Sequence, residues 1–454
     1  SYTNVVRTVM TRTRREYLLT VGITGVTGLA GCASDDSSAD GAPDRAADET
    51  PSGTSPDTGG AGTTSTPTQA ETTTGTETES DTPPPSVPIA EVSGVSTLGY
   101  NPGRQNATPD GNGGVSGFEQ RWRQVLFPSG SVSQPVVMNG QVYTTGGLEN
   151  ESPVRVRSTS GEELWTFAPE AGGAGLPTVV DETVVVGTTG DDTASAVGGV
   201  YGLDPANGSE RWTIETGDYN TGLVTAAVDG VLYFTGTRMN GDGSNALYAY
   251  SIDGREQLWE TELEDEPDRV PVVSGSTIAV KSGNSIIGVN RATGEVRWSV
   301  PELLGGGLRS PHSIATDDGY IGLQDQHGLV EVTASDGSTR QIADMEAVPQ
   351  AVSGEYVIAA SMENGTVIAI STSDGAVRWE KDLEFRFPSC AIAGETVYAA
   401  GDKPVESGKI VALSLADGSE RARTGFPASA GTPVVADGYV FVPVGNTLFA
   451  LEEN

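Results

Sequence analysis

The chain has 454 residues, more than one hydrophobic core usually organises, so an array of repeats is a natural architecture. It contains 61 acidic and 26 basic residues, and the resulting net charge of −35 would repel a nucleic-acid backbone. We therefore exclude nucleic acid as the expected partner and expect a salt-adapted protein, with an ordinary acidic secreted protein as the alternative.

Residues 1–32 have the pattern of an export signal. Arg14 and Arg15 precede a short, weakly apolar stretch, which resembles the twin-arginine export motif. The stretch ends in Leu29-Ala30-Gly31-Cys32, which resembles a lipobox, and this resemblance implies that Cys32 is lipidated. Met10 is a candidate for the true start. We expect the protein at the extracellular face of the cytoplasmic membrane, attached by the lipid anchor only; a cytosolic protein with an accidental Arg-Arg pair is the alternative.

Residues 33–91 are rich in Thr, Ser, Pro, Gly, Asp and Glu and have almost no large apolar side chain. Such a composition cannot offset the entropy lost on folding, so it predicts a disordered acidic stalk. Residues 92–454 form the folded part and open with a lead-in rich in glycine and asparagine.

One unit repeats through the folded part: a strand end, a turn containing glycine, and a second strand that begins near a tryptophan. The stretch from Gly202 to Trp212 shows it best. A turn glycine precedes every tryptophan by four or five positions; these tryptophans are Trp122, Trp165, Trp212, Trp259, Trp298 and Trp379. Degenerate copies place Gln341 and Ala422 in the tryptophan position, so the markers number eight.

A second marker gives the same count. A short apolar run that begins at a proline precedes a Val/Ile/Tyr-rich strand in each unit, with Val224 in place of one proline; the prolines are Pro135, Pro177, Pro271, Pro311, Pro349, Pro388 and Pro433. About four short strands per unit, eight times, predict an all-β, eight-bladed β-propeller with four-stranded antiparallel blades. The chain opens on a tryptophan strand and ends without one, so we expect the first and last segments to pair and close the ring of a monomer.

The stretch from Gly202 to Trp212 resembles the tryptophan-docking motif of the pyrroloquinoline-quinone (PQQ) type of propeller repeat. The segment from Tyr100 to Asn106 also resembles the lead-in of such proteins. We interpret the six tryptophans as structural docking residues between blades, because the indole offers a large flat surface and an N–H donor. The resemblance specifies the fold and not the activity, since propellers host many functions.

The PQQ family includes quinoprotein dehydrogenases, and the resemblance to it implies a quinone held under a disulfide between adjacent cysteines, near a calcium ion. The two cysteines here, Cys32 and Cys390, are not adjacent, and the two histidines, His312 and His327, lie apart on one repeat. We therefore expect no catalytic, cofactor-binding or metal residues, with neither PQQ nor calcium bound. Cys390 is expected to be a buried apolar group.

Three arginines occupy equivalent positions, two residues before the proline of their units: Arg269, Arg309 and Arg386. Ring geometry would bring them to one side of the channel mouth, where they are candidates for binding an anionic group. The alternative is that they pair with the neighbouring Glu264, Asp268 or Glu384. Long connections around 146–153, 189–199, 236–245 and 401–408 elaborate the same face.

The chain is most similar to the propeller lipoprotein of the bacterial outer-membrane barrel-assembly machinery, and its acidity leads us to expect a halophilic archaeon as its source. This resemblance implies recognition of protein partners. We expect a non-catalytic binding or scaffold module at the cell surface for a protein or glycan partner. The alternative is a PQQ-dependent dehydrogenase of alcohols or sugars. Sequons at Asn106, Asn150, Asn207 and Asn364 are candidate glycosylation sites.

Overall fold

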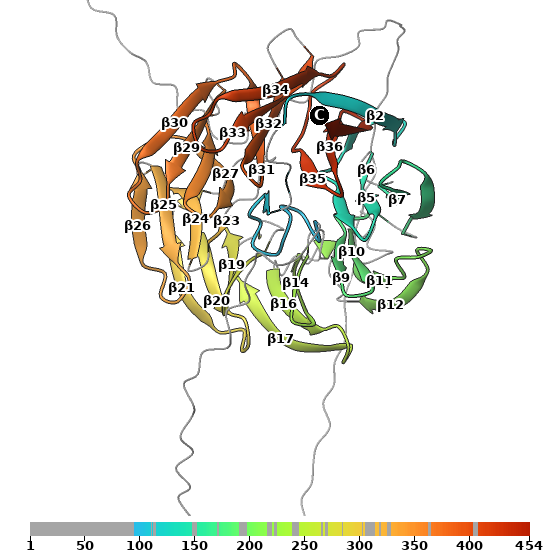
Figure 1. Cartoon of the computed structure of the whole chain (residues 1–454). Helices are drawn as coiled ribbons and strands as arrows, with labels where there is room; N and C mark the ends of the chain where they lie inside the picture. The colour runs from blue at the N-terminus through green and yellow to red at the C-terminus, as the bar shows by residue number, and fades with distance from the viewer. Residues whose placement is uncertain are drawn as a thin grey trace, which may run out of the picture. The chain divides into compact units, whose positions relative to one another are not determined.

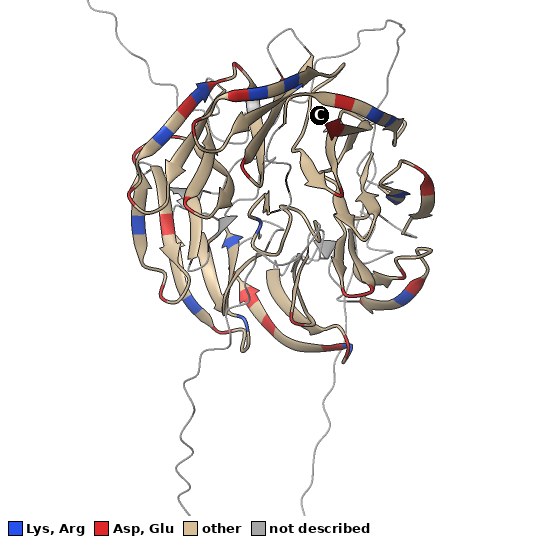
Figure 2. Cartoon of the chain, viewed as in Figure 1, with Lys and Arg blue, Asp and Glu red and all other residues tan. Residues whose placement is uncertain are grey.

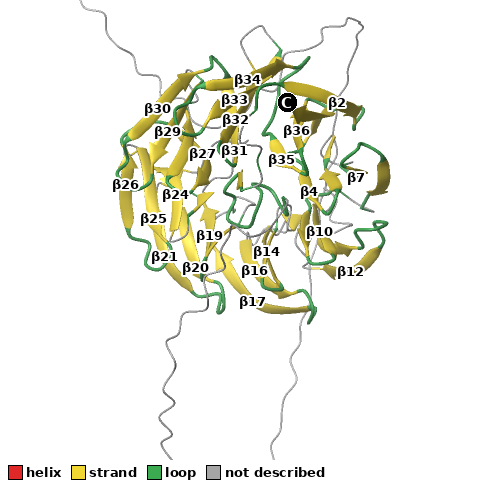
Figure 3. Ribbon diagram, in the orientation of Figure 1, coloured by secondary structure: helices red, strands yellow, loops and turns green. Residues whose placement is uncertain are grey.

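The computed structural model describes the propeller and most of its connections, all within one compact unit, Ser80–Asn454. The described residues are 95–109, 111, 115–147, 152–169, 172–189, 198–215, 220–221, 225–237, 245–264, 267, 271–283, 285–301, 303–304, 314–316, 319–324, 328–361, 365–402 and 407–454. Every regular element in these ranges is a strand (Figure 3). None of them contains a helix that could cross a membrane.

The strands form eight antiparallel blades arranged in a ring (Figure 1), as the sequence predicted. We call the first strand of each blade, nearest the ring centre, its inner strand, and the fourth strand its outer strand. Blade 1 contains β4 (Val136–Met138), β5 (Gln141–Thr144), β7 (Val154–Ser158) and β8 (Glu163–Phe167). Blade 2 contains β9 (Thr178–Val180), β10 (Thr183–Thr189), β11 (Gly199–Leu203) and β12 (Glu210–Glu215). Blade 3 contains β14 (Ala226–Val228), β15 (Val231–Thr237), β16 (Asn245–Ser251) and β17 (Glu256–Leu263).

The next blades follow the same order. Blade 4 contains β18 (Val272–Ser274), β19 (Thr277–Ser282), β20 (Ser285–Asn290) and β21 (Val296–Pro301). Blade 5 contains β23 (Ile314–Ala315), β24 (Gly319–Gln324), β25 (Gly328–Thr333) and β26 (Thr339–Ala343). Blade 6 contains β27 (Val348–Ser353), β28 (Tyr356–Ala360), β29 (Thr366–Ser371) and β30 (Val377–Asp382). Blade 7 contains β31 (Arg386–Ala393), β32 (Thr396–Asp402), β33 (Gly408–Ser414) and β34 (Glu420–Gly425).

Blade 8 closes the ring, and it does so as the sequence predicted. Its inner three strands are β35 (Val434–Ala436), β36 (Tyr439–Val444) and β37 (Thr447–Glu453), and its outer strand is β2 (Phe118–Val125) from the other end of the domain. β2 pairs antiparallel with β37, so that Trp122 lies opposite Ala450. Pairing the two ends of the domain leaves no gap in the ring.

Further short strands join the blades along their connections. They are β1 (Ala107–Thr108), β3 (Ser131–Val132), β6 (Gly146–Gly147), β13 (Asn220–Thr221) and β22 (Leu303–Leu304). β13 pairs with both β10 and β15 and so links blades 2 and 3 into one sheet.

Small residues in the third strand of a blade make room for the indole of the outer strand. A Cβ atom added to Gly202 would lie 2.0 Å from Cε2 of Trp212, and one added to Gly288 would lie 2.0 Å from Cε2 of Trp298. The pairing register shifts directly after these glycines, between Gly202 and Leu203 and between Gly288 and Val289. The repeat motif therefore encodes a bulge that lets the ring of Trp lie across its own blade.

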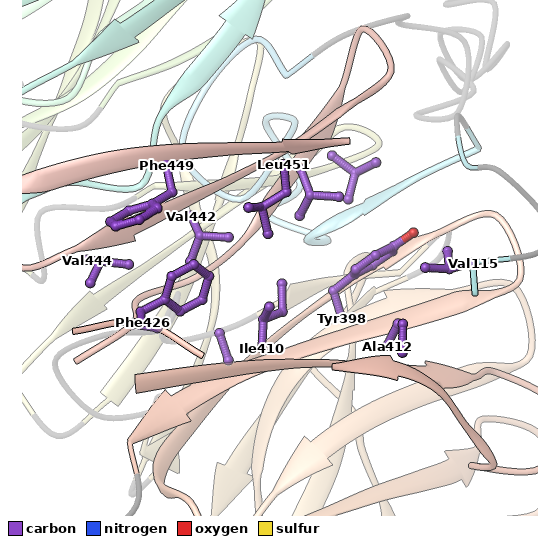
Figure 4. Packing of buried hydrophobic residues seen from close by; sticks show 14 of the residues in the cluster. Val115, Tyr398, Ile410, Ala412, Phe426, Val442, Val444, Phe449 and Leu451 are labelled. Atoms are coloured by element: carbon purple, nitrogen blue, oxygen red, sulfur yellow. The ribbon is translucent and has the colours of Figure 1, made fainter. Parts of the chain in front are cut away.

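The core consists of apolar layers between neighbouring blades. Between blades 7 and 8, Phe426 and Phe449 meet edge to face with their centroids 5.1 Å apart (Figure 4). Tyr398 and Ile410 of blade 7 and Val442 of blade 8 complete this layer and are fully buried. Charged residues concentrate on the outer strands (Figure 2), where Arg211 pairs with Asp204 at 2.8 Å and Arg340 with Glu331 at 2.6 Å. In the described part of the chain, much of the charge therefore lies on the circumference, in contact with solvent.

Candidate functional site

The centre of the ring is occupied by the chain itself. Residues 95–109, which we call the lead-in, precede blade 1 and are drawn in blue at the ring centre in Figure 1. Their backbone is folded tightly: the amide of Arg104 donates to the carbonyl oxygen of Asn101 at 2.9 Å, and the amide of Asn106 donates to that of Gly99 at 2.9 Å. Gly99 has φ +71°, and a Cβ atom there would lie 2.8 Å from Cα of Arg104. Only glycine permits this approach.

Backbone hydrogen bonds tie the lead-in to the inner strands of blades 1, 2, 4, 6 and 7. The donors and acceptors are Val95 N and Val137 O at 2.7 Å, Val179 N and Ser96 O at 2.7 Å, Val273 N and Pro102 O at 3.0 Å, Val352 N and Gln105 O at 2.9 Å, and Ile392 N and Asn106 O at 2.8 Å. In addition, β1 runs parallel to β31, pairing Ala107 with Ile392. The segment thus acts as a hub that contacts inner strands all around the ring.

Side chains extend the hub to blades 3 and 8. Thr97 donates its hydroxyl to the carbonyl oxygen of Thr225 at 3.2 Å. The hydroxyl of Tyr100 donates to the carbonyl oxygen of Pro433 at 3.2 Å and accepts from the amide of Val435 at 2.8 Å. Burial raises the pKa of the Tyr100 phenol well above its ordinary value, so the group stays neutral and keeps its donor.

Arg104 lies at the middle of the lead-in and is fully buried. Its guanidinium donates to the carbonyl oxygens of Leu98 at 2.7 Å and Thr225 at 2.8 Å, to that of Pro271 at 3.4 Å, and to the hydroxyl of Thr97 at 2.8 Å. All four acceptors are neutral, and burial lowers the pKa of Arg104 to about 9. The side chain is still charged at neutral pH, and its hydrogen bonds offset part of the cost of removing it from water.

The arginine positions predicted to bind an anion are only partly described. Arg386 is the first residue of β31, is exposed, and lies opposite Asp402 in the pairing register. Arg269 and Arg309 lie outside the described residues, as do His312 and His327. Convergence of the three arginines therefore stays a prediction.

Cys390 lies in the inner strand of blade 7 and is fully buried as a free thiol. Burial raises its pKa well above the ordinary thiol value, so it is a poor nucleophile and a poor metal ligand. Among the described residues there is no group of three His, Cys, Asp or Glu side chains placed to hold a metal ion. No cysteine stands beside Cys390 in the sequence, so it cannot form the adjacent-cysteine disulfide implied by the resemblance to quinoprotein dehydrogenases.

The other candidates divide between buried, exposed and undescribed positions. Asn106 is 2% exposed, and its amide donates to the carbonyl oxygen of Gln350 at 2.7 Å, so its sequon is closed in the folded protein. Asn207 is exposed in the turn between β11 and β12. Arg14, Arg15, Cys32, Asn150 and Asn364 lie outside the described residues.

Five of the six tryptophans dock on the following blade in the same way, each donating its indole N–H to a turn carbonyl. The bonds run from Trp122 to Thr159 at 2.9 Å, Trp165 to Pro205 at 2.8 Å, Trp259 to Arg291 at 3.1 Å, Trp298 to Ala334 at 2.8 Å and Trp379 to Leu415 at 2.7 Å. The sixth, Trp212, donates its indole N–H to no residue in the described ranges. Blade 3, which follows it, has Arg255 at the turn position where the blades docked by the other five have glycine.

The position of the lead-in was missed by reasoning from the sequence. Its motif from Tyr100 to Asn106 was recognised, but nothing local to it shows that it lies on the ring axis. The available signal was a run of turn-forming residues around Arg104, in a chain with few cations. A buried arginine requires many acceptors, and the inner strands supply them.

Comparison with solved structures finds the same propeller fold at low identity. A quinohemoprotein alcohol dehydrogenase, ADHIIG from Pseudomonas putida HK5, is 12% identical with a TM-score of 0.59, over 79% of this chain and 80% of that one. The quinohemoprotein alcohol dehydrogenase from Comamonas testosteroni is 13% identical with a TM-score of 0.58, over 80% and 81%. BamB from Moraxella catarrhalis is 14% identical with a TM-score of 0.48, over 74% and 97%.

Comparison with curated protein sequences finds no match. The sequence does match one protein-family description in three overlapping or successive stretches, residues 102–222, 196–357 and 363–454. Together these stretches cover the lead-in from Pro102 onward and the eight blades, except for residues 358–362 in blade 6. The chain belongs to this family of PQQ-like repeat propellers, described as outer membrane protein assembly factor BamB.

Proposed function

We propose that the protein is a non-catalytic binding or scaffold module that recognises a protein partner at the cell surface, with a glycan as the second partner class. The observation that supports this most is the filled centre of the ring. The lead-in makes hydrogen bonds to inner strands of blades 1, 2, 3, 4, 6, 7 and 8. What remains for recognition is the outer surface and the loops, where propellers of many kinds bind partners.

The proposal includes export and anchoring. Arg14 and Arg15 would direct export, and lipidated Cys32 would hold the propeller at the extracellular face of the cytoplasmic membrane of a halophilic archaeon through residues 33–91. Replacing Cys32 with Ser should release the protein from the membrane fraction. If the C32S protein stays bound to washed membranes as the parent does, the lipid anchor is wrong.

The anion-binding role of Arg269, Arg309 and Arg386 is part of the same proposal. Guanidinium groups suit carboxylates, because each can donate two parallel hydrogen bonds. A triple Arg→Ala variant should lose an acidic partner or acidic glycan that the parent retains. Unchanged binding of every partner would contradict this role.

Two experiments test the function itself. Cross-linking on intact cells in high salt, followed by mass spectrometry, should recover a recurrent protein partner through lysines or acidic residues of the propeller. Adding quinone, calcium, a dye acceptor and a panel of alcohols and sugars to the purified chain should give no turnover. Robust dye reduction would overturn the proposal in favour of a PQQ-dependent dehydrogenase, and binding on a carbohydrate array without any protein cross-link would favour the glycan class.

A further inference from the structure

The docking of Trp212 on blade 3 lacks the indole hydrogen bond that the other tryptophans make in the described part of the chain, and the turn that it faces also differs. In the blades that follow Trp165, Trp259 and Trp298, the turn residue over the indole is glycine with positive φ. A Cβ atom added to Gly208, Gly294 or Gly337 would lie 2.5 to 2.8 Å from the indole atoms of these tryptophans. No side chain fits between such a turn and its tryptophan without a shift of one of them.

Arg255 occupies the corresponding position in blade 3. It has φ +53°, a left-handed conformation that costs an L residue about 1–2 kcal/mol. Its turn is well fixed, because the amide of Arg255 donates to the carbonyl oxygen of Ser251 at 2.9 Å and the hydroxyl of Tyr250 donates to that of Arg255 at 3.0 Å. A strained residue that the surroundings hold in place is a reason to look for a binding role.

A pocket lies between Trp212 and the turn of blade 3 that contains Arg255. It is lined by Trp212, Thr213, Ile214, Leu232, Tyr250, Ser251, Ile252 and Arg255. One face of the indole rests on Gly202 of its own blade. Within the described ranges neither the indole N–H of Trp212 nor the guanidinium of Arg255 has a hydrogen-bond or ion-pair partner. The pocket therefore combines apolar walls with two sets of unused donors.

The size and charge of the pocket select its occupant. Its volume is about 60 Å³, well below the roughly 150 Å³ of a cavity that holds a benzene ring, so it suits one side-chain terminus better than a sugar ring. The indole N–H of Trp212 and the guanidinium of Arg255 are donors, and the guanidinium is a cation in a chain of net charge −35. A carboxylate matches a guanidinium, and an aliphatic stem matches the half-buried Ile252.

We propose that the pocket between Trp212 and Arg255 binds the carboxylate side chain of an acidic segment of a partner polypeptide. The carboxylate accepts from the guanidinium of Arg255 and the indole N–H of Trp212, and the stem of the side chain packs on Ile252, which is half-buried. This inference rests on the proposed function for the class of partner, but it uses none of the three arginines predicted to bind an anion.

The test uses the full chain labelled with 5-fluorotryptophan and observed by ¹⁹F NMR. The Trp212 resonance is assigned as the one that disappears in Trp212→Phe. The probe is N-acetyl-Ala-Glu-Ala amide at millimolar concentration, with the matched Gln peptide as its neutral counterpart. We expect the Glu peptide to shift the Trp212 resonance saturably while the other five stay in place, and the Gln peptide to bind at least tenfold more weakly.

Variants separate the charge from the open turn. Arg255→Ala keeps the backbone position and removes the guanidinium, so the Glu and Gln peptides should bind equally weakly. Arg255→Gly should close the turn on the indole, move the Trp212 resonance without any peptide and abolish the response. Arg123→Ala, which removes an exposed arginine of β2, should leave the titration unchanged.

Three results would overturn the inference: no saturable shift of Trp212, equal shifts with the Glu and Gln peptides, or a shift produced by saccharides and not by peptide. A failure here is distinguishable from failure of the proposed function. Dye reduction with quinone would refute the binding module whatever this pocket does, whereas a partner cross-linked elsewhere on the ring would leave the module standing and this pocket without its role.

Discussion

The guanidinium of Arg104 donates to the carbonyl oxygen of Thr225 at 2.8 Å and so fixes the lead-in to the inner edge of blade 3. The two residues are separated by 121 positions in the chain. Similar hydrogen bonds join the lead-in to the inner strands of other blades, so the centre of this propeller is a packed interior.

Replacing Arg104 with Met tests this interior. The apolar side chain avoids burying a charge, but it removes the guanidinium donor from the carbonyl oxygens of Leu98 and Pro271 and leaves that of Thr225 to the hydroxyls of Thr97 and Thr178. We expect a loss of about 2–4 kcal/mol in the free energy of unfolding, measured by denaturant titration in high salt. The control is Arg123→Met, at an exposed position of β2, which should change the free energy of unfolding by less than about 0.5 kcal/mol.

The tryptophans should differ in what they contribute to stability. Trp298 is 7% exposed and donates to Ala334, whereas Trp212 is partly exposed and has no such bond in the described part of the chain. Trp298→Phe should therefore lower the free energy of unfolding by about 1–2 kcal/mol more than Trp212→Phe. Equal losses, measured by thermal and chemical unfolding, would mean that Trp212 docks as the others do.

The turn glycines offer a matched pair. Gly337 has φ +71° and Gly438 has φ +79°, but a Cβ atom at Gly337 would lie 2.6 Å from Cβ of Trp298, while one at Gly438 would meet nothing within 4 Å. Gly438→Ala should lower the free energy of unfolding by about 1 kcal/mol, because only the backbone is strained. Gly337→Ala should lower it by about 2–4 kcal/mol, because the added Cβ also meets Trp298.

Arg255→Gly should raise the free energy of unfolding by up to about 1 kcal/mol, because glycine adopts φ +53° without strain.

Stability should fall in alkali because of buried phenols. Burial raises the pKa values of Tyr100, Tyr320 and Tyr398 above the ordinary value of 10.0. Above pH 10 these phenols release protons in the unfolded chain that they retain in the folded protein. Together they outweigh the opposite effect of Arg104, whose pKa burial lowers, so the free energy of unfolding decreases as pH rises. Tyr100→Phe should make this decrease shallower between pH 10 and 12, as followed by unfolding at a series of pH values; an unchanged slope would contradict the burial of Tyr100.

The architecture was predictable because the same short motif of turn residues and a tryptophan recurs along the chain. Trp298 and its partners recur at a regular spacing, and the degenerate Gln341 kept the count of eight units in phase. Ring closure followed from Trp122 standing alone at the start, and the structure places its strand beside β37. Each of these inferences needed only turn residues and an aromatic marker.

The position of the lead-in could not be predicted, since its partners are remote. The hydroxyl of Tyr100 donates to the carbonyl oxygen of Pro433, 333 positions away, and no periodic pattern in the sequence predicts such a contact.

The Trp212 pocket could not be predicted for a different reason. Gly254 supplied the expected turn glycine in the sequence, but the structure places Arg255, one position later, at the positive φ. A shift of one residue decides whether the turn closes on the indole.

Hydrogen–deuterium exchange of the amides of residues 95–108 tests the central claim most directly, that the ring centre is filled by the lead-in. The account predicts that the amides of Val95, Tyr100, Arg104 and Asn106 exchange as slowly as those of the inner strands, because each is buried and donates to a carbonyl oxygen. Exchange of these amides at the rate of an unstructured peptide, while Val137 and Ile392 stay protected, would contradict it.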